Sequence, residues 1–402
     1  MNRIQVEDFV NNRITGRKRS LFEQDILNNF SLLSSEIKNK SILVIGGAGT
    51  IGKSFIKEIL QFKPKKIVIV DTNENGLTEI TRDLRSDFSQ KLPDLYFTYP
   101  MNFGDDVFYK MCDYHGKFDI VANFAAHKHV RSEKDIFSIQ AMLENNVLNA
   151  KKLLDYLKIN KPSHFFCVST DKAANPVNVM GASKKLMEDI VFSYSNSFKI
   201  TTARFANVAF SNGSLLEGFI NRINSNQPIS CPIDVKRFFV SIKESGQICM
   251  LSCILGNSGE IYYPKLNESN LISFKDITIS FFNELNIDID LCKSENEARL
   301  KSNSLIKKSY PIFFFKSNTS GEKLYEEFYS ENDIIDENSF VGLGIIKEIK
   351  KIDSNKVDDI VKKLNTNFKS SKNNKKIIIN LMNDILKNFN HIETGKNLDQ
   401  KM

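Results

Sequence analysis

Short apolar runs alternate with amphipathic stretches through the first half of the chain. Runs of about five residues predict buried parallel strands, because helices cover both faces of such a sheet. These runs lie at residues 41–45, 66–70, 95–99, 118–123, 164–168 and 200–205. Apolar residues at helical spacing predict helices at residues 53–60, 75–88, 136–160 and 180–196. Repeated strand–helix units of this kind predict an α/β fold with a doubly wound parallel sheet.

The alternation weakens beyond Asn207, where the pattern predicts helices separated by short strands. Helices are expected at residues 214–225, 243–255 and 273–285, and strands at residues 260–263 and 312–315. The apolar run Phe313–Phe315 is predicted to lie in the core. We interpret this region as a smaller lobe that closes over the substrate.

Polar, helix-prone segments flank these two regions. In the first segment, apolar residues recur at helical spacing: Leu21, Phe22, Ile26, Leu27, Phe30 and Leu33. That arm is expected to pack against the domain or a neighbouring subunit. The predicted division is an N-terminal helical arm (1–40), a nucleotide-binding domain (41–207), a substrate-binding lobe (208–349) and a helical tail (350–402). This division allows a strand or helix from the sequence range of one central unit to belong to the fold of the other.

The glycine-rich stretch Gly46–Gly52 lies between the first predicted strand and the helix that follows it. In a dinucleotide-binding turn, Gly46 permits the tight bend, Gly49 lets the backbone approach a pyrophosphate, and Gly52 lets the helix pack closely. The helix N-terminus then holds the phosphates. Asp71 ends the second strand about 20 residues later, where an acid accepts hydrogen bonds from a ribose diol and repels a 2′-phosphate. These features predict a Rossmann-type domain that binds NAD rather than NADP.

Composition narrows the function classes. The chain has 402 residues, 41% of them hydrophobic, and a formal net charge of +7 that favours attraction of an anionic substrate. No apolar run approaches the roughly 20 residues of a membrane span, and no signal-peptide core is present, so a cytoplasmic protein without a membrane span is expected. No nucleic-acid-binding motif accompanies the basic residues, so no nucleic-acid partner is expected. The six cysteines lack metal-ligand spacing, so no metal site is predicted; Cys249 and Cys253 are expected in the core.

Three polar clusters follow strand ends or begin the next helix. They are Ala125–Val130 after the fourth strand, Ser169–Lys172 after the fifth, and Met180–Lys184 at the head of the following helix. Ligands of doubly wound sheets bind at the carboxyl ends of the strands, so these clusters are expected to converge. Met180 and Lys184 are about one helical turn apart and face the same side.

With these motifs the chain resembles the extended short-chain dehydrogenase/reductases, and among them the UDP-N-acetylglucosamine 4,6-dehydratases of bacterial polysaccharide biosynthesis. The resemblance covers roughly residues 21–328 and is to the members without transmembrane helices. The segments that carry it are Gly46–Gly52, Lys128–Val130, Ser169–Pro176, Met180–Lys184, Ala203–Val208, Lys236–Phe239 and Gly321–Glu327. It implies that NAD takes hydride from C4 of the sugar, that water is eliminated across C5 and C6, and that hydride returns to C6.

The resemblance also implies roles for individual residues. Thr170 hydrogen-bonds the C4 oxygen; Lys172 is the base at C5, if burial and neighbouring Lys184 lower its pKa; Asp171 is the acid at the C6 oxygen, if burial keeps it protonated. Lys184 holds the nicotinamide ribose and supplies positive charge. The implied cofactor-binding residues are Gly46, Gly49, Thr50, Ile51, Gly52, Asp71, Asn102, Ala125, Lys128 and Lys184. The implied substrate-binding residues are His129, Asn207, Ser211, Arg237 and Glu322.

Two positions depart from the pattern of the family. Short-chain dehydrogenases usually have Tyr where this chain has Met180, and a thioether cannot act as a base. A subset of the sugar dehydratases shares Met-Gly-Ala-Ser-Lys together with Thr-Asp-Lys, so activity is still expected, but the base for the C4 hydroxyl is left open. Thr319 and Ser320 replace the Arg-Pro that many relatives have before the Gly-Glu-Lys segment.

The expected partners are a UDP-sugar substrate and further copies of the chain in a homo-oligomer. Two alternative functions are retained. A C5-epimerising dehydratase or a 4-epimerase would act on the same sugar, although such enzymes normally keep the Tyr. A catalytically silent NAD-binding regulator would explain Met180, but it has no need for Asp171, Lys172 and Lys184 together.

Overall fold

The computed structural model describes residues 5–87, 89, 91–302, 309–317, 321, 323, 325–347, 349, 351–370, 373–393 and 395. Three positions discussed above, Thr319, Ser320 and Glu322, lie outside these residues.

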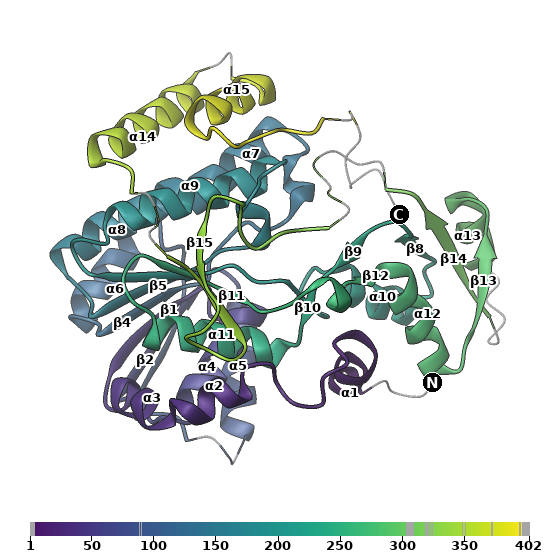
Figure 1. The fold of residues 1–402 in the computed structure, drawn as a ribbon, viewed down its shortest axis with the longest axis horizontal. Coiled ribbons are helices and arrows are strands. Elements are labelled where there is room, and N and C mark those ends of the chain that lie inside the picture. The colour runs from purple at the N-terminus through teal and green to yellow at the C-terminus, as the bar shows by residue number, and fades with distance from the viewer. Residues whose placement is uncertain are drawn as a thin grey trace.

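A nine-stranded sheet forms the centre of the larger lobe (Figure 1). Seven strands are parallel in the order β3-β2-β1-β4-β5-β6-β11, and β16 and β15 continue the sheet antiparallel at one edge. Their bounds are β1 Ser41–Ile45, β2 Lys66–Asp71, β3 Leu95–Pro100, β4 Ile120–Asn123, β5 His164–Val168, β6 Lys199–Ala203, β11 Glu260–Pro264, β15 Ile334–Asp336 and β16 Leu343–Lys347. The predicted doubly wound, Rossmann-type sheet is therefore confirmed.

Helices cover both faces of this sheet (Figure 1). On one face lie α4 (Thr50–Leu60), α5 (Glu74–Ser86) and α11 (Ile242–Leu255). On the other lie α6 (Asp106–His115), α7 (Ile136–Leu143), α8 (Asn149–Ile159) and α9 (Val179–Ser193). A π-helical segment, Glu144–Leu148, joins α7 to α8, so the single helix predicted over residues 136–160 is interrupted. The prediction did not include α6.

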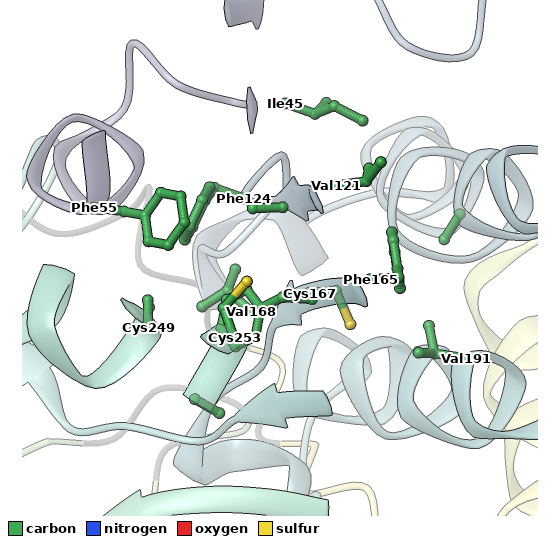
Figure 2. Close-up of a cluster of buried hydrophobic side chains, with 14 of the residues drawn as sticks. Ile45, Phe55, Val121, Phe124, Phe165, Cys167, Val168, Val191, Cys249 and Cys253 are labelled. Carbon is green, nitrogen blue, oxygen red and sulfur yellow. The ribbon is translucent and has the colours of Figure 1, made fainter. Parts of the chain in front are cut away.

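The core between the layers is shown in Figure 2. Phe55 of α4 packs on Phe124 beyond β4, with ring centroids 5.0 Å apart, and Val191 of α9 lies on the opposite side of the strands. Cys249 and Cys253 of α11 are fully buried in the core, as predicted. All six cysteines are buried and free.

A second, smaller lobe contains a parallel three-stranded sheet in the order β13-β14-β8. Its strands are β8 Ile229–Pro232, β13 Asp288–Cys292 and β14 Ser309–Phe315, and its helices are α10 Leu215–Asn224, α12 Phe274–Leu285 and α13 Glu295–Ser302. Short strand pairs, β7 (Asn207–Val208) with β10 (Phe239–Val240) and β9 (Lys236–Arg237) with β12 (Ile272–Ser273), lie near the junction. Although β11, β15 and β16 follow residue 207 in the chain, they belong to the large sheet.

The expectation that Phe313–Phe315 lies in the core is wrong for two of its residues. Phe313 and Phe315 are half-buried and stack on each other with ring centroids 6.0 Å apart, outside the core clusters. Phe314 points to the other face of β14 and packs against the core of the smaller lobe. Alternation along the strand separates the three rings, because successive side chains point to opposite faces.

The N-terminal arm contacts both lobes of its own chain. It contains α1 Val6–Phe9, a π-helical segment Val10–Ile14, α2 Glu23–Asn28 and α3 Phe30–Ile37. Phe9 enters the core of the smaller lobe, whereas Phe22 and Leu33 are fully buried in the larger one. Between them, Arg17 donates to both carboxylate oxygens of Glu244 on α11, at 2.9 and 2.8 Å. Leu27 and Phe30 are at least half exposed, because the predicted amphipathic helix is broken in two at Asn29.

The C-terminal tail forms two helices, α14 (Ser354–Lys369) and α15 (Lys375–Ile385), which lie over α9 (Figure 1). The chain then pairs with the loop before α9: the backbone N–H groups of Asn390 and Ile392 donate to the carbonyls of Pro176 and Val177. Among the described residues, no helix is both long and apolar enough to cross a bilayer.

Candidate functional site

Two adjoining cavities lie at the carboxyl ends of the central strands. One, of about 250 Å³, follows the glycine turn; the other, of about 320 Å³, lies between the sheet and the smaller lobe. They share Ile51, Phe124, Ala126 and Lys128. The first is lined by the predicted cofactor-binding residues Gly46, Gly49, Thr50, Ile51, Gly52, Asp71, Asn102, Ala125 and Lys128. The second is lined by the predicted residues His129, Thr170, Asp171, Lys172, Lys184, Asn207 and Ser211, and by Met180.

The glycine turn leaves the first cavity open for a dinucleotide. Gly46 has φ +76°, and a Cβ there would lie 2.5 Å from the backbone nitrogen of Ala125, so the turn passes directly against the end of β4. Gly49 is the N-cap of α4, and no side chain caps this helix end, so its N–H groups are available to phosphates. At the end of β2, the Asp71 carboxylate accepts from the N–H of Ala48 at 3.0 Å. Helix end and carboxylate suit the pyrophosphate and a ribose diol.

Thr170, Asp171 and Lys172 form a tight turn after β5, at the floor of the second cavity. One carboxylate oxygen of Asp171 accepts three hydrogen bonds: from the Thr170 hydroxyl at 2.7 Å, the Lys172 backbone N–H at 2.9 Å and the Lys172 ammonium at 3.0 Å. A Cβ on Gly181 would lie 2.5 Å from the carbonyl oxygen of Lys172. The glycine therefore allows the first turn of α9 to pack against the turn that carries the two proton-transfer candidates.

Lys172 also faces a carboxylate from a distant part of the chain. Its Nζ lies 3.6 Å from Oε1 of Glu326, and the side chains are 16% and 4% exposed. Burial alone would lower the pKa of Lys172, but the charges of Asp171 and Glu326 outweigh it and raise that pKa. This differs from the lowering that was expected from burial and Lys184. Burial raises the pKa of Glu326, with Lys172 and Arg237 opposing.

Lys184 has a different environment, one turn into α9. Its Nζ donates to the carbonyl of Val168 at 2.8 Å, and burial lowers its pKa to about 8. Met180 is 2% exposed and lines the same cavity. Because a thioether holds no titratable proton, Met180 cannot act as a base.

The predicted substrate-binding residues divide into three groups. His129, Asn207 and Ser211 line the second cavity. Arg237 is outside the lining: its Nη1 donates to the carbonyls of Lys236 at 2.9 Å and Lys323 at 3.0 Å, and the side chain is buried. The structure does not describe Glu322. At the boundary between the lobes, Lys128 donates to the carbonyl of Asn212 at 3.0 Å.

Two residues that contribute to this site were not singled out from the sequence. Asn146, in the π-helical segment, accepts from the backbone N–H of His127 and donates to its carbonyl, each at 2.9 Å, and thereby fixes the loop after β4. Polar Asn145 and Asn146 inside a predicted helix were the available signal, because π-helical turns are frequent at functional sites. Glu326 lies inside the Gly321–Glu327 segment that carried the family resemblance, but local sequence does not indicate that it meets Lys172.

One cluster among the described residues has the composition of a metal site. Glu133, His391 and Glu393 bring three ligand atoms close together at the C-terminal tail. The ammonium group of Lys375 lies 2.6 Å from Oε2 of Glu393 and 3.6 Å from Oε1 of Glu133, so a cation is already provided by the chain. The other Glu133 oxygen accepts from the N–H of Val179 at the start of α9, at 2.7 Å. The cluster therefore ties the tail to α9.

Comparison with known proteins agrees with the fold. The family model described as "Polysaccharide biosynthesis protein" matches residues 42–348. The chain belongs to this family. It is 28% identical over 379 residues to the capsular polysaccharide biosynthesis protein CapD of Staphylococcus aureus, which covers 92% of this chain and 57% of CapD. The family member thus spans little more than half the length of that relative.

Two further similarities lie closer to the predicted chemistry. The chain is 28% identical over 237 residues to a UDP-N-acetylglucosamine 4,6-dehydratase (inverting) of Campylobacter jejuni, covering 56% of this chain and 67% of that one. The solved dTDP-glucose 4,6-dehydratase DesIV of Streptomyces venezuelae, with NAD and TYD bound, superimposes with a TM-score of 0.55. That match has 17% identity and covers 73% of this chain and 84% of DesIV, so it supports the fold alone.

Proposed function

We propose that this family member is an NAD-dependent nucleotide-sugar 4,6-dehydratase that converts UDP-N-acetylglucosamine to its 4-keto-6-deoxy form for surface glycan biosynthesis. The observation that carries the proposal is the joined pair of cavities, with a dinucleotide-type turn in one and Thr170, Asp171 and Lys172 in the other. The resemblance of the motifs supports this reaction. The Campylobacter relative has the name of an inverting dehydratase, so it supports 4,6-dehydration of this sugar, and the configuration at C5 is decided by the experiment below. The homo-oligomer and the cytoplasmic location expected from the sequence stay predictions.

NAD+, when bound in the first cavity, supplies the hydride acceptor for C4 and later the hydride donor for C6. The chain's own residues handle the protons. Thr170 is placed to hydrogen-bond the C4 oxygen, and its hydroxyl already donates to Asp171. Lys172 must first pass the proton that its raised pKa favours to the Asp171 carboxylate, whose oxygen lies 3.0 Å from its ammonium nitrogen. Asp171, then the acid, protonates the C6 oxygen so that it leaves as water, while Lys172, then the base, removes the C5 proton. The Lys172 ammonium exchanges with solvent and later delivers one proton to C5.

The alternatives use the same cavities. A 4-epimerase or a C5-epimerising dehydratase would also need C4 oxidation, and such enzymes normally have the Tyr that Met180 replaces. A silent NAD-binding regulator would need the first cavity but not the hydrogen bond between Lys172 and the buried Asp171 carboxylate in the second. The pair therefore favours turnover over regulation.

The deciding experiment is incubation of the purified protein with UDP-N-acetylglucosamine in deuterated water, without added NAD. We expect a 4-keto-6-deoxy product, detected by NMR, with one deuterium at C5, because the C5 proton is removed and replaced during elimination. The configuration at C5 then separates a retaining dehydratase from an epimerising one. Recovery of unchanged sugar by a protein that retains NAD would contradict the proposed substrate, and a panel of other nucleotide sugars would distinguish a different substrate from a regulator.

Replacement of Gly46 by alanine is expected to weaken NAD binding. The new Cβ would meet the backbone nitrogen of Ala125 at 2.5 Å, and the left-handed φ of +76° strains any residue with a side chain. A cost of about 1–3 kcal/mol corresponds to roughly tenfold to a hundredfold weaker binding. The measurement is the NAD released from denatured protein per chain, together with titration calorimetry. Gly395→Ala is a suitable control, since this glycine also has positive φ but its Cβ position is open and far from β1 in sequence. Equal NAD content in the Gly46 variant and the parent would contradict the assigned role of the turn.

A further inference from the structure

Glu326 is a buried acid outside the cavity that holds the proposed reacting groups. It lies near the end of the Gly321–Glu327 segment and is 4% exposed, yet its side chain contacts two cations. Oε1 lies 3.6 Å from Nζ of Lys172 and 3.9 Å from Nη2 of Arg237. Glu326 is not among the residues that line the cavity of Lys172. Its carboxylate therefore contacts the lysine from outside that cavity.

Three charged groups surround the Lys172 ammonium within this network. Asp171 precedes it in the turn after β5 and accepts its hydrogen bond at 3.0 Å; Glu326 approaches from the segment before Phe328; Arg237 approaches from β9. Lys323, in the same segment as Glu326, adds a further positive charge near that acid. Without Glu326, the Lys172 ammonium would lose one of the two carboxylates that face it, while the repelling charge of Arg237 would remain.

We propose that Glu326 is a positioning residue for the reaction: its carboxylate holds the Lys172 ammonium against Asp171 and thereby sets the protonation state of the proton-transfer pair. The inference rests on the proposed function for its effect on turnover, but its effect on Lys172 is a property of the chain alone. The same carboxylate faces Arg237, which lies outside the cavity lining and donates to the Lys323 carbonyl. Glu326 therefore lies between two cations, one of which lines the cavity.

The segment that carries Glu326 is fixed from several directions. The carbonyl of Lys323 accepts from Arg237 at 3.0 Å, and the carbonyl of Phe328 accepts from Arg204 at 2.9 Å. Glu327, the neighbouring acid, turns outward and accepts from the Asn175 side chain at 2.8 Å. The two adjacent glutamates thus have different environments, and this gives a matched control.

The test measures the protonation of Lys172 directly. Trace acetylation of the purified protein with acetic anhydride over a pH series, read by mass spectrometry, gives the apparent pKa of each reactive lysine amine. In Glu326→Gln we expect the apparent pKa of Lys172 to fall by about one unit, because one of two favourable carboxylate charges is gone. Lys363, an exposed lysine of α14, is an internal reference and should keep its value in every variant.

Three further variants define the result. Glu326→Asp keeps the charge and is expected to keep the apparent pKa of Lys172 closer to the parent value. Glu327→Gln is expected to leave it unchanged. Arg237→Gln removes a repelling cation and is expected to raise the apparent pKa of Lys172. This variant keeps the inference testable if Glu326→Gln folds poorly. An unchanged value for Lys172 in both Glu326→Gln and Arg237→Gln would overturn the inference.

Turnover separates this inference from the proposed function. If the parent converts UDP-N-acetylglucosamine, the limb of its pH–rate profile that depends on Lys172 should move to lower pH in Glu326→Gln. If Glu326 had a purely structural role, the same variant would have a lower rate but an unshifted limb. If the parent converts no nucleotide sugar but the acetylation result holds, the proposed function fails and the role of Glu326 stands.

Discussion

Replacement of Asp171 by asparagine is expected to lower turnover of the nucleotide sugar by about a thousandfold, within the range for loss of a general acid. Asparagine has nearly the same shape, and its carbonyl can still accept from the Thr170 hydroxyl and the Lys172 backbone, which are 2.7 and 2.9 Å from the present carboxylate oxygen. It cannot deliver a proton to a departing oxygen, and it removes the charge that holds the Lys172 ammonium. The fold should therefore survive while the chemistry stops.

The measurement is the initial rate of 4-keto-6-deoxy sugar formation, followed by mass spectrometry, alongside NAD content and thermal unfolding. Asp359→Asn is the control, because this aspartate lies on the surface of α14 in an ion pair with Lys363 and is remote from the cavities. A variant at Asp171 that turned over within a few-fold of the parent would exclude this residue from proton transfer. Retained NAD with no product would support the assigned role.

Most parallel strands of the large sheet could be located from local sequence, because β1, β2, β4 and β5 are largely buried on both faces. The run Ser41–Ile45 is continuous and apolar, as β1 is in the structure, and the glycines after it lead into α4. The antiparallel strand β16, which lies next to the edge strand β15, and the helix α6 were not predicted. Both are shaped by tertiary contacts: β16 pairs with β11 across a long insertion, and α6 packs its aromatic Tyr109 on Tyr156 of α8.

The residues of the site likewise comprise some that local sequence locates and some that depend on tertiary contacts. Residues next to a strand end, such as Asp171 and Lys172, could be located because parallel strands deliver their carboxyl ends to one edge of the sheet. The protonation of Lys172 could not be predicted, because it depends on Glu326, which reaches the turn only through the folded path of the chain. Asn146 was not recognised, because helical periodicity shows that a segment is helical but not that one of its turns is π-helical.

The buried ion pair between Arg204 and Glu188, close to the site, is the basis of the second large expected effect, a loss of stability. Arg204, on the residue after β6, donates to both oxygens of Glu188 on α9 at 2.9 and 2.7 Å, and the Ser169 hydroxyl donates to the same carboxylate at 2.6 Å. Burial opposes ionisation of Glu188, but Arg204 outweighs it and lowers the pKa of this carboxyl. The pair joins α9 and the end of β6 to the residue before the proton-transfer turn. It also holds the Phe328 carbonyl, just after Glu326.

Arg204→Met is expected to destabilise the protein by about 3–5 kcal/mol, because it leaves the Glu188 carboxylate buried without its cation. Urea unfolding followed by circular dichroism measures the change, with Lys363→Met, in an exposed pair, expected to leave the midpoint unchanged. The double replacement Arg204→Met with Glu188→Met should recover much of the loss, since the unpaired charge is removed as well. A single variant as stable as the parent would show that the pair contributes nothing net.

The pH dependence of the unfolding free energy tests independently whether the unpaired charge of Glu188 causes the destabilisation. In the parent, Glu188 has a lowered pKa in the folded state, so the stability it contributes is present at neutral pH and is lost as pH falls through the folded pKa. In Arg204→Met, the buried carboxyl has lost the guanidinium that favoured its charge and should bind a proton more readily. The difference in unfolding free energy between parent and variant should therefore narrow as the pH is lowered below the ordinary range of a glutamate. A constant difference over the same pH series would indicate that lost packing around the arginine stem, rather than the unpaired charge, accounts for the destabilisation.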